Sequence, residues 1–184
     1  MNLQDTLLQK LAPLWEEEII LKRNEFLLKE GDLNNNTYLI TSGSVRVFIL
    51  DKEGNEHTIR FGYAKSFTGG LDTFLVEKPT KFYIQAIKET HLKYLSKDKF
   101  SEFLHSSPEN QSLWQKFLEL LVYQQLEREI DLITFTPKER LLRVLDRSPQ
   151  LFQEIPQKHI ASYLRMTPET LSRILKNIDS NQSF

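Results

Sequence analysis

Residues 155–178, IPQKHIASYLRMTPETLSRILKNI, carry the pattern that decides the fold of the C-terminal part of this chain. Apolar residues recur at helical spacing on either side of a break, which predicts two short helices that cross at a steep angle. The second helix has its own start signal, because Thr167 can cap it, Pro168 suits its first position, and Glu169 favours the positive helix end. The sequence therefore predicts a helical pair joined by a tight turn.

The second predicted helix has an apolar side, formed by Leu171, Ile174 and Leu175, and a polar side. The polar side offers a guanidinium, an ammonium, a carboxylate and hydroxyls, the groups that contact base edges and phosphates in a major groove. A polar helical hairpin is also common in α-rich proteins, where Glu169 and Arg173 would only pair with each other on a solvated face. The candidate DNA-binding residues are Thr167, Glu169, Thr170, Ser172, Arg173 and Lys176.

The run IASYLRMTPETLSRIL resembles the helix-turn-helix of the Crp/Fnr family of bacterial transcription regulators. The family's recognition helix carries a similar E-T-x-x-R run, matched here by Glu169, Thr170 and Arg173. Arg165 stands where the family's turn usually has Gly, so a positive φ there would cost about 1 kcal/mol. The sequence reaches Phe184 without the β-wing that often follows the recognition helix. We therefore expect a smaller DNA contact than the family's full surface, or one helped by a dimer partner.

Residues 19–96 differ from the rest of the chain in their sequence pattern, which consists of short apolar or alternating runs separated by turn residues. They predict at least six short strands, a spacing typical of a β-roll or jelly roll. The clearest runs are residues 37–40, 45–49, 57–61, 82–87 and 91–95. The run KEGDLNNNTYLITSGSVRVFILDKEGNE is also similar to the Crp/Fnr sensor domain. An isolated roll could serve a kinase or a channel, so its pairing with the helix-turn-helix motif is what indicates transcription.

Residues 108–133 predict a helix that begins at Pro108 after a Ser107 cap, while residues 1–18 predict one or two short amphipathic helices. The long helix would extend nearly 40 Å at about 1.5 Å per residue. Its apolar stripe could pack inside the monomer. We favour a parallel dimer, because the resemblance implies one and because two recognition helices one DNA turn apart need a two-fold axis. The predicted dimerisation residues are Phe117, Leu118, Leu121, Val122, Leu126, Ile130 and Ile133.

A capping-box pattern at Thr136 to Glu139 predicts the start of a further helix, with one basic and one apolar face. We therefore expect an α+β fold in three parts. These are a β-roll or jelly-roll sensor domain at residues 1–107, a dimerisation helix at residues 108–135 and a small helix-turn-helix domain at residues 136–184. Residues 136–184 contain eight Lys or Arg and five Asp or Glu. This modest basic excess fits a DNA-binding domain that follows a more acidic sensor domain.

The predicted sensor domain lacks groups that hold a cyclic nucleotide. Family members that bind one use a Gly-Glu pair and an Arg-Ser or Arg-Thr pair ahead of a strand. In the run FTGGLDTFLVEKPTKFYIQA, Gly70 stands in place of the Glu, and Thr80 and Lys81 stand in place of the second pair. Lys81 would restore a charge, but a shift of one residue along a strand points a side chain to the opposite face. The candidate pocket residues are Gly69, Gly70, Leu71, Thr80 and Lys81.

We therefore expect that neither cyclic AMP nor cyclic GMP binds. The effector is either a different small molecule or absent, in a degenerate pocket filled by aromatic rings. The rings in question are Phe67, Phe74, Phe82 and Tyr83.

Composition excludes several classes of protein. At 40% hydrophobic and 27% charged residues, the chain has an ordinary globular composition. No apolar run approaches the roughly 20 residues that span a bilayer, and the N-terminus lacks a signal-peptide pattern, so we expect a cytoplasmic protein without membrane contact. The absence of Cys excludes an iron–sulfur cluster held by thiolates, and hence the family's oxygen-sensing branch. The four His show no metal-ligand spacing.

No nucleophile–base pair or phosphate-cradling Gly loop is present in the sequence, so we expect no enzyme. The predicted function is a sequence-specific DNA-binding transcription regulator of Crp/Fnr type. Its partners would be double-stranded DNA and a second copy of the chain, with RNA polymerase as a further candidate. The alternative is a cyclic-nucleotide-responsive signalling module without DNA contact.

Overall fold

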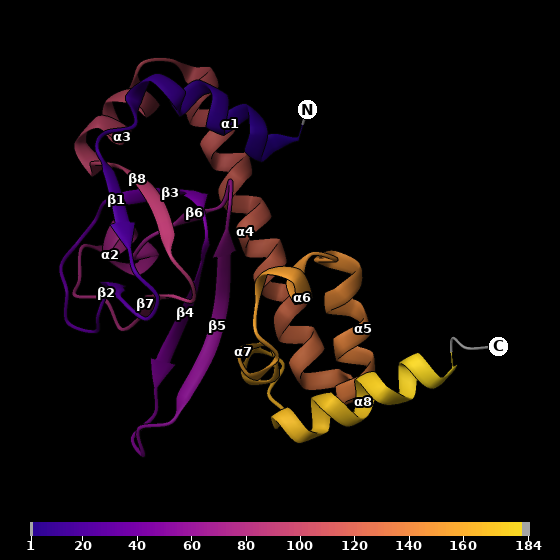
Figure 1. Cartoon of the computed structure of the whole chain (residues 1–184). Helices are drawn as coiled ribbons and strands as arrows, with labels where there is room; N and C mark the ends of the chain where they lie inside the picture. Colours follow the sequence, from indigo (N-terminus) through magenta and orange to yellow (C-terminus); the bar gives the residue numbers. More distant parts are fainter. Residues whose placement is uncertain (1, 182–184) are drawn as a thin grey trace.

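A computed structural model describes residues 2–181, with side chains for all of these except Thr134 and residues 179–181. Two four-stranded antiparallel sheets form a roll, which Figure 1 shows beside a separate group of C-terminal helices. One sheet has the strand order β1-β8-β3-β6 and the other β2-β7-β4-β5. The strands are β1 (Glu18–Leu21), β2 (Phe26–Leu28), β3 (Thr37–Ser42), β4 (Ser44–Leu50), β5 (Glu56–Tyr63), β6 (Phe67–Thr68), β7 (Tyr83–Ala86) and β8 (Thr90–Leu95).

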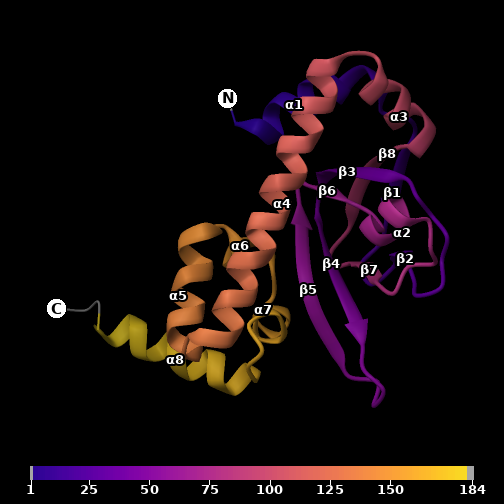
Figure 2. The same ribbon diagram turned by 180° about the vertical axis from the view of Figure 1, so that it is seen from behind.

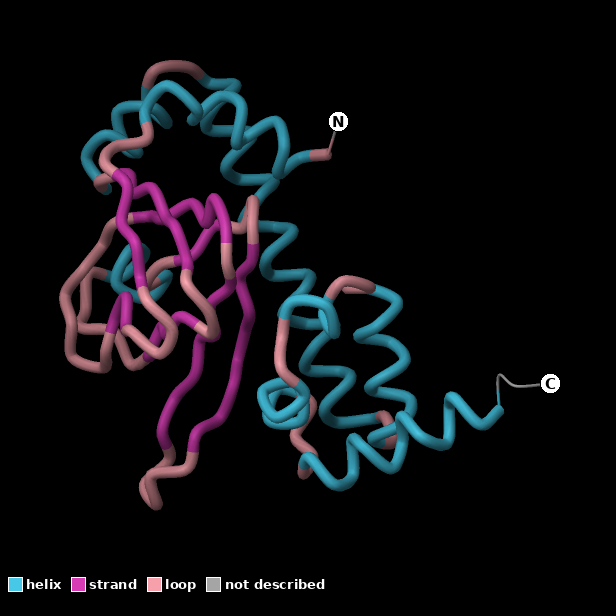
Figure 3. Tube along the Cα trace, viewed as in Figure 1, coloured by secondary structure: helices cyan, strands magenta, loops and turns pink. Residues whose placement is uncertain are grey.

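The roll closes because its strands alternate between interior and exterior side chains. In β3, Tyr38 and Ile40 are buried while their neighbours are more exposed. Side chains of both sheets, including Leu28, Val45 and Leu92, form one buried cluster with these two. Burying each such side chain contributes about 1.5–3 kcal/mol. The predicted β-roll is confirmed, and Figure 3 shows that its strands gather in one half of the molecule.

A group of helices covers one end of the roll. They are α1 (Leu3–Leu11), the short 3-10 helix η1 (Ala12–Leu14), α3 (Lys97–His105) and the start of α4 (Pro108–Thr134); α2 (Leu71–Val76) follows strand β6 within the roll. The apolar cluster under the covering helices includes Leu7, Phe100 and Phe117. The partly buried Trp114 packs against it. The Phe100 and Trp114 rings lie 4.9 Å apart at an edge-to-face angle of 73°. This aromatic packing fixes the direction in which α4 leaves the roll.

Helix α4 is the predicted long helix, and its start signal works as expected, because the Ser107 hydroxyl accepts a hydrogen bond from the Asn110 amide at 3.2 Å. Seen from behind in Figure 2, the helix runs from the roll to the C-terminal helices. It ends before Thr136, which begins the next helix with the predicted capping box. The C-terminal helices are α5 (Pro137–Arg147), α6 (Leu151–Glu154), α7 (Gln157–Tyr163) and α8 (Pro168–Asn181).

The C-terminal helices share a core of their own. Leu141, Ile160 and Leu171, from α5, α7 and α8, are each 0% exposed. Ala161 is also fully buried, at the point where α7 turns toward α8. The sensor domain adds Ile87 to the same cluster, and Phe61 packs against it. The two halves of the molecule are therefore joined by apolar contact as well as by α4.

Candidate DNA-binding face and ligand cavity

Helix α8 begins as its sequence predicts, since the Thr167 hydroxyl accepts a hydrogen bond from the Thr170 amide at 3.2 Å. Its inner side is fixed by Leu171, which is fully buried, and Ile174, which is 9% exposed. The outer side carries Glu169, Arg173 and Lys176, all exposed, beside the partly buried Thr170 and Ser172. The six predicted DNA-binding residues therefore lie along one face or at the start of a single exposed helix.

This outer face borders a shallow hollow at the crossing of α7 and α8. Gln157 and Asn177 also line this hollow, and neither is among the six predicted DNA-binding residues. Gln157 belongs to the first turn of α7, so its proximity to Arg173 depends on the crossing of two helices. Asn177 follows Lys176 on the last turns of α8 and could have been found from helical periodicity.

Glu169 and Arg173 form no ion pair with each other within residues 2–181, although they are four residues apart on one face. The Glu169 carboxylate interacts instead at the helix start, where its own backbone N–H and the Thr167 hydroxyl lower the pKa of Glu169. The guanidinium of Arg173 thus remains directed to solvent. A solvated Glu–Arg pair, the alternative reading of this face, does not form.

The turn between α7 and α8 contains Arg165 in the left-handed conformation, with φ of 55°. A residue other than glycine therefore has positive φ in this turn. Its Nη1 lies 2.6 Å from His57 Nδ1 on strand β5, and His57 Nε2 lies 2.7 Å from Asp51 Oδ2. Because Arg can only donate, Nδ1 accepts and Nε2–H donates to Asp51. Hydrogen bonds from His57 and Asn55 hold the pKa of the Asp51 carboxyl well below its usual range.

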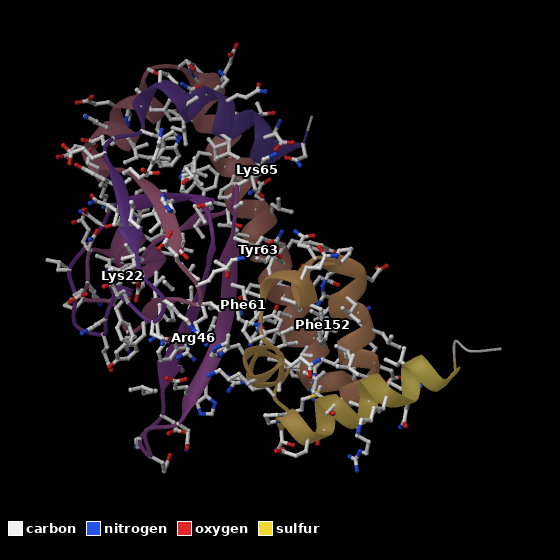
Figure 4. All side chains as sticks on the ribbon, in the orientation of Figure 1. Lys22, Arg46, Phe61, Tyr63, Lys65 and Phe152 are labelled. Carbon is white, nitrogen blue, oxygen red and sulfur yellow. The ribbon has the colours of Figure 1, made fainter. Side chains whose placement is uncertain are left out.

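Helix α7 packs directly on strand β5. The Ser162 hydroxyl accepts from the Thr58 amide at 3.1 Å and donates to the Glu56 carbonyl at 3.3 Å. The Phe61 ring lies 5.4 Å from that of Tyr163. Figure 4 shows Phe61 and Tyr63 on the side of the roll that faces the C-terminal helices, with Phe152 approaching from the other side. The helix that supports the candidate recognition helix is thus held by the sensor domain.

A buried cation adds to this contact. Arg46 is 6% exposed, and it binds both oxygens of Glu56, with Nη1–Oε2 at 2.5 Å and Nη2–Oε1 at 2.9 Å. Its Nη1 also lies 3.5 Å from His159 Nδ1 on α7. Burial, together with the positive charges of Arg46 and Lys158, lowers the pKa of His159 to about 4. His159 is therefore neutral at physiological pH and suits a site beside a guanidinium.

The basic face predicted for α5 is not available to DNA. Arg143 Nε binds Asp131 Oδ1 at 2.5 Å, and its Nη2 binds Glu127 at 2.9 Å. Arg147 binds the same two acids of α4. Burial would raise the pKa of Asp131, but hydrogen bonds from Arg147 and Arg143 outweigh it and hold that pKa below its usual value. These ion pairs fix α5 to α4 and engage Arg143 and Arg147 within the domain.

Much of the predicted dimerisation stripe on α4 is exposed in the single chain. The exposed fractions are 59% for Val122, 52% for Leu126, 45% for Ile130 and 74% for Ile133, with Tyr123 beside them at 61%. Leu118 and Leu121 are partly buried. Phe117 differs from the others, because it is 6% exposed and stacks on Trp114 at 5.6 Å in its own chain. Phe117 therefore belongs to the core and not to the exposed stripe.

A cavity of about 230 Å³ lies between the inner side of the roll and α4. The predicted pocket residues Gly69, Gly70 and Leu71 line it, whereas Thr80 and Lys81 do not. Phe67, Phe74 and Phe82 form part of its wall, but they do not fill it. The fourth ring expected there, Tyr83, points elsewhere and stacks on Phe48 at 5.2 Å. The expectation that rings fill the pocket is therefore wrong.

The place expected to hold a nucleotide phosphate is occupied by a carboxylate of the chain itself. The Thr80 hydroxyl donates to Asp72 Oδ1 at 3.0 Å, and the Lys81 amide donates to Asp72 Oδ2 at 3.0 Å. Thr80 is 2% exposed, while the Lys81 side chain is exposed. Lys81 was predicted to lie on a strand with its side chain on the opposite face. This prediction is wrong, because strand β7 begins two residues later, at Tyr83. Asp72 thus satisfies donors that would otherwise face an anion.

The glycine pair also restricts this site. Gly69 has φ of 148°, and a Cβ there would lie 2.8 Å from the Asn36 carbonyl oxygen. A Cβ on Gly70 would lie 3.2 Å from the Thr73 hydroxyl, so a Glu at that position would require its neighbours to move. The Glu and Arg of the nucleotide-binding pattern are therefore replaced by Gly70 and Thr80, neither of which carries a charge.

The described residues contain neither a cluster of metal ligands nor a membrane-spanning helix. No three His, Asp or Glu side chains among them lie close enough together to hold a metal ion. Within the same residues, no helix is both long enough and apolar enough to cross a membrane.

The fold and site together define a cyclic-nucleotide-binding-type roll joined by a long helix to a helix-turn-helix. The family model of the cyclic nucleotide-binding domain matches residues 18–107. Over nearly its whole length, the chain is similar to transcription regulators of the Crp/Fnr family.

Three such proteins match both the roll and the helices that follow it. The transcriptional activator protein Anr of Pseudomonas protegens is 22% identical over 99% of this chain and 78% of its own length. The structure of FixK2 from Bradyrhizobium japonicum matches with a TM-score of 0.76 and 18% identity, covering 90% of this chain and 85% of that one. TTHA1359 from Thermus thermophilus, a CRP/FNR family regulator, matches with a TM-score of 0.67 and 19% identity over 90% and 87% of the two chains.

Proposed function

We propose that this protein is a dimeric transcription regulator that binds specific DNA sites through helix α8. The observation that carries the proposal is the outer face of α8. Arg173 and Lys176 are exposed on this face, while the inner side of the helix is buried against α5 and α7. Arg173 suits bidentate contact with guanine, and Thr167 and Thr170 lie at the helix start, where phosphate is favoured.

The exposed stripe of α4 supports the dimer. Val122, Leu126 and Ile133 leave a row of large apolar side chains in contact with water, which a second copy of the helix would cover. A two-fold axis along α4 would place two copies of α8 on one side of the assembly. Their half-sites are then expected about one helical turn of DNA apart, roughly 34 Å.

The effector is, by the same proposal, not cyclic AMP. The hydrogen bonds from Thr80 and Lys81 to Asp72 support this view, because a phosphate would have to displace a carboxylate held by the chain. The alternative function, a nucleotide-responsive module without DNA contact, loses its main support for the same reason. The relative Anr is named a transcriptional activator, which favours RNA polymerase as a further partner of the DNA-bound dimer.

Selection of binding sites from random duplex DNA with the purified full chain is the direct test. We expect an inverted repeat whose half-sites lie about one turn apart. As a control, Arg23→Ala removes an exposed cation from the roll and should select the same site. Enrichment of no sequence over the starting pool, under low-salt conditions that favour DNA binding, would refute the proposal.

A further inference from the structure

Arg60 is a cation that points into the cavity. It stands opposite Val47 in the pairing of β4 with β5, and Val47 lines the cavity. Two residues further along the same strand, Gly62 faces Ile40 and Val45 inside the roll. Because side chains alternate along a strand, Arg60 shares this inner face. Both Arg60 and Val47 accordingly belong to the cavity wall.

The guanidinium of Arg60 has no hydrogen-bond or carboxylate partner among the residues that the structure describes. Three other arginines of the interior have acceptors, because Arg46 binds Glu56 while Arg128 and Arg140 donate to backbone carbonyls. Burial lowers the pKa of Arg60, yet an Arg side chain stays charged in proteins. A partly buried positive charge without a counterion is unfavourable, and such a group in a cavity is a candidate for ligand binding.

The surroundings of Arg60 increase the local positive potential. Arg128 on α4 is near enough that the two charges repel, and this repulsion contributes to the lowered pKa of Arg128, after burial. Arg128 is held by the Thr58 and Tyr163 carbonyls, at 3.3 and 3.4 Å. The cavity wall contains no Asp or Glu among the described residues. Arg60 therefore has a second cation nearby and no carboxylate in the wall of its cavity.

The rest of the wall is apolar, apart from a few neutral polar groups. Aromatic and aliphatic side chains come from the roll and from helices α1, α3 and α4. Gln125 of α4 adds an amide. The apolar lining residues are Leu7, Val47, Ile59, Phe61, Phe67, Leu71, Phe74, Phe82, Phe100, Trp114, Phe117 and Leu121. Such a site favours a ligand with an apolar body and few polar groups, whose position one charged contact fixes.

We propose that this cavity binds a small organic anion with an apolar body, and that Arg60 holds its acid group. A carboxylate would form a bidentate contact with the guanidinium and supply the missing counterion. The apolar body would lie against the Trp114 and Phe67 side of the cavity. Asp72 already occupies the phosphate position, so the acid group lies at Arg60 and not at the glycine pair.

Such a ligand would contact both elements that hold the C-terminal domain. Phe61 follows Arg60 on β5 and packs on Tyr163 of α7. Leu121 and Gln125 lie on α4, one to two turns before Arg128. A bound effector of this class would therefore contact the elements that determine where the recognition helix lies. The proposal concerns ligand binding alone and holds or fails independently of DNA recognition.

The test is calorimetry on the full chain with 4-phenylbutyrate and with 4-phenylbutanol, its neutral counterpart. We expect the acid to bind one per chain and at least about tenfold more tightly than the alcohol, because a charged hydrogen bond distinguishes them. Arg60→Gln should remove most of this preference, and Arg23→Gln, at an exposed position, should leave it unchanged. Equal affinity for acid and alcohol, or no acid binding up to millimolar concentration, would overturn the proposal.

Fluorescence locates the bound probe. The chain has two Trp, and Trp114 lines the cavity while Trp15 does not. In a Trp15→Phe background, 4-phenylbutyrate should change the emission of Trp114 with the same saturation curve as calorimetry. Binding without any change in that emission would place the probe elsewhere and contradict the assignment. The thermal midpoint of Arg60→Gln should be unchanged or higher, since an unpaired charge is removed, so loss of binding cannot be attributed to unfolding.

Discussion

Arg165 of the helix-turn-helix contacts His57 of the sensor domain, with Nη1 and Nδ1 2.6 Å apart. Arg165 is also strained, because its φ of 55° is one that glycine adopts more readily. The side chain and the backbone therefore have opposite effects on stability at this position. An exposed polar contact of this kind contributes about 0.5–1.5 kcal/mol, which is similar to the backbone strain of about 1 kcal/mol.

Two substitutions at Arg165 separate these effects. Arg165→Ala loses the contact and keeps the strain, whereas Arg165→Gly loses both. We expect the Gly variant to have a free energy of unfolding about 1 kcal/mol higher than the Ala variant and close to that of the wild type. Urea denaturation of the three proteins measures it. Equal stability of the Ala and Gly variants would show that the turn is not strained.

Stability should fall on acidification because of His159. Its pKa is about 4 in the folded protein and 6.5 when unperturbed, so the unfolded chain binds the proton more readily between these values. The contribution is therefore complete above pH 6.5 and is lost as the pH falls toward 4. The slope is at most about 1 kcal/mol per pH unit, allowing for partial solvent exposure.

The groups facing His159 are Arg46 and Glu56 of the roll and Lys158 of its own helix. His159→Gln keeps a polar side chain that does not titrate in this range. The difference in unfolding free energy between wild type and variant should thus change with pH between 6.5 and 4. A difference independent of pH in that window would show that His159 does not titrate as its surroundings predict.

Arg173 and Lys176 should differ in how they affect DNA binding. Arg173→Ala is expected to cost about 1–3 kcal/mol on the preferred site and to blur preference at one base pair per half-site. Lys176→Ala should weaken binding to all sequences similarly and reduce the salt dependence. Binding to a panel of single-base variants measures both. An unchanged profile for Arg173→Ala would contradict base contact by this helix.

Dimerisation through α4 predicts the effect of Leu126→Glu. Two buried carboxylates would face each other near the two-fold axis, so the chain should sediment at equilibrium with the monomer mass of 21.7 kDa. Leu142→Glu, at an exposed leucine of α5, is the matched control and should remain a dimer. The wild type should have about twice the monomer mass at micromolar concentration. A wild-type monomer that still binds DNA tightly would refute the dimer.

Cyclic AMP should bind weakly or not at all to the wild type. The charged partners expected for its ribose and phosphate are replaced by Gly70 and Thr80, and each lost contact removes roughly 1.5–3 kcal/mol. The combined loss corresponds to more than about a hundredfold in affinity. Calorimetry decides the matter, and a micromolar dissociation constant would show that another group compensates.

The sequence predicted those parts of the protein that depend on local pattern. The start of α8 at Thr167, the Ser107 cap and the capping box at Thr136 follow from side chains that bind backbone amides three residues away. The helical spacing of α8 predicted which of its side chains are buried, because burial follows the period of the helix. These features need no knowledge of the rest of the chain.

Other features depend on contacts between distant residues, and only the tertiary structure decided them. Phe117 fits the apolar stripe of α4 by spacing, but the packing of α1 and α3 places it in the core. Asp72 takes the phosphate position because the loop before β7 returns to the start of α2. Arg60 becomes an unpaired cation of a cavity only when strand β5 closes the roll against α4. Sequence period assigns a side chain to a face, whereas its partners depend on which other face the fold brings against it.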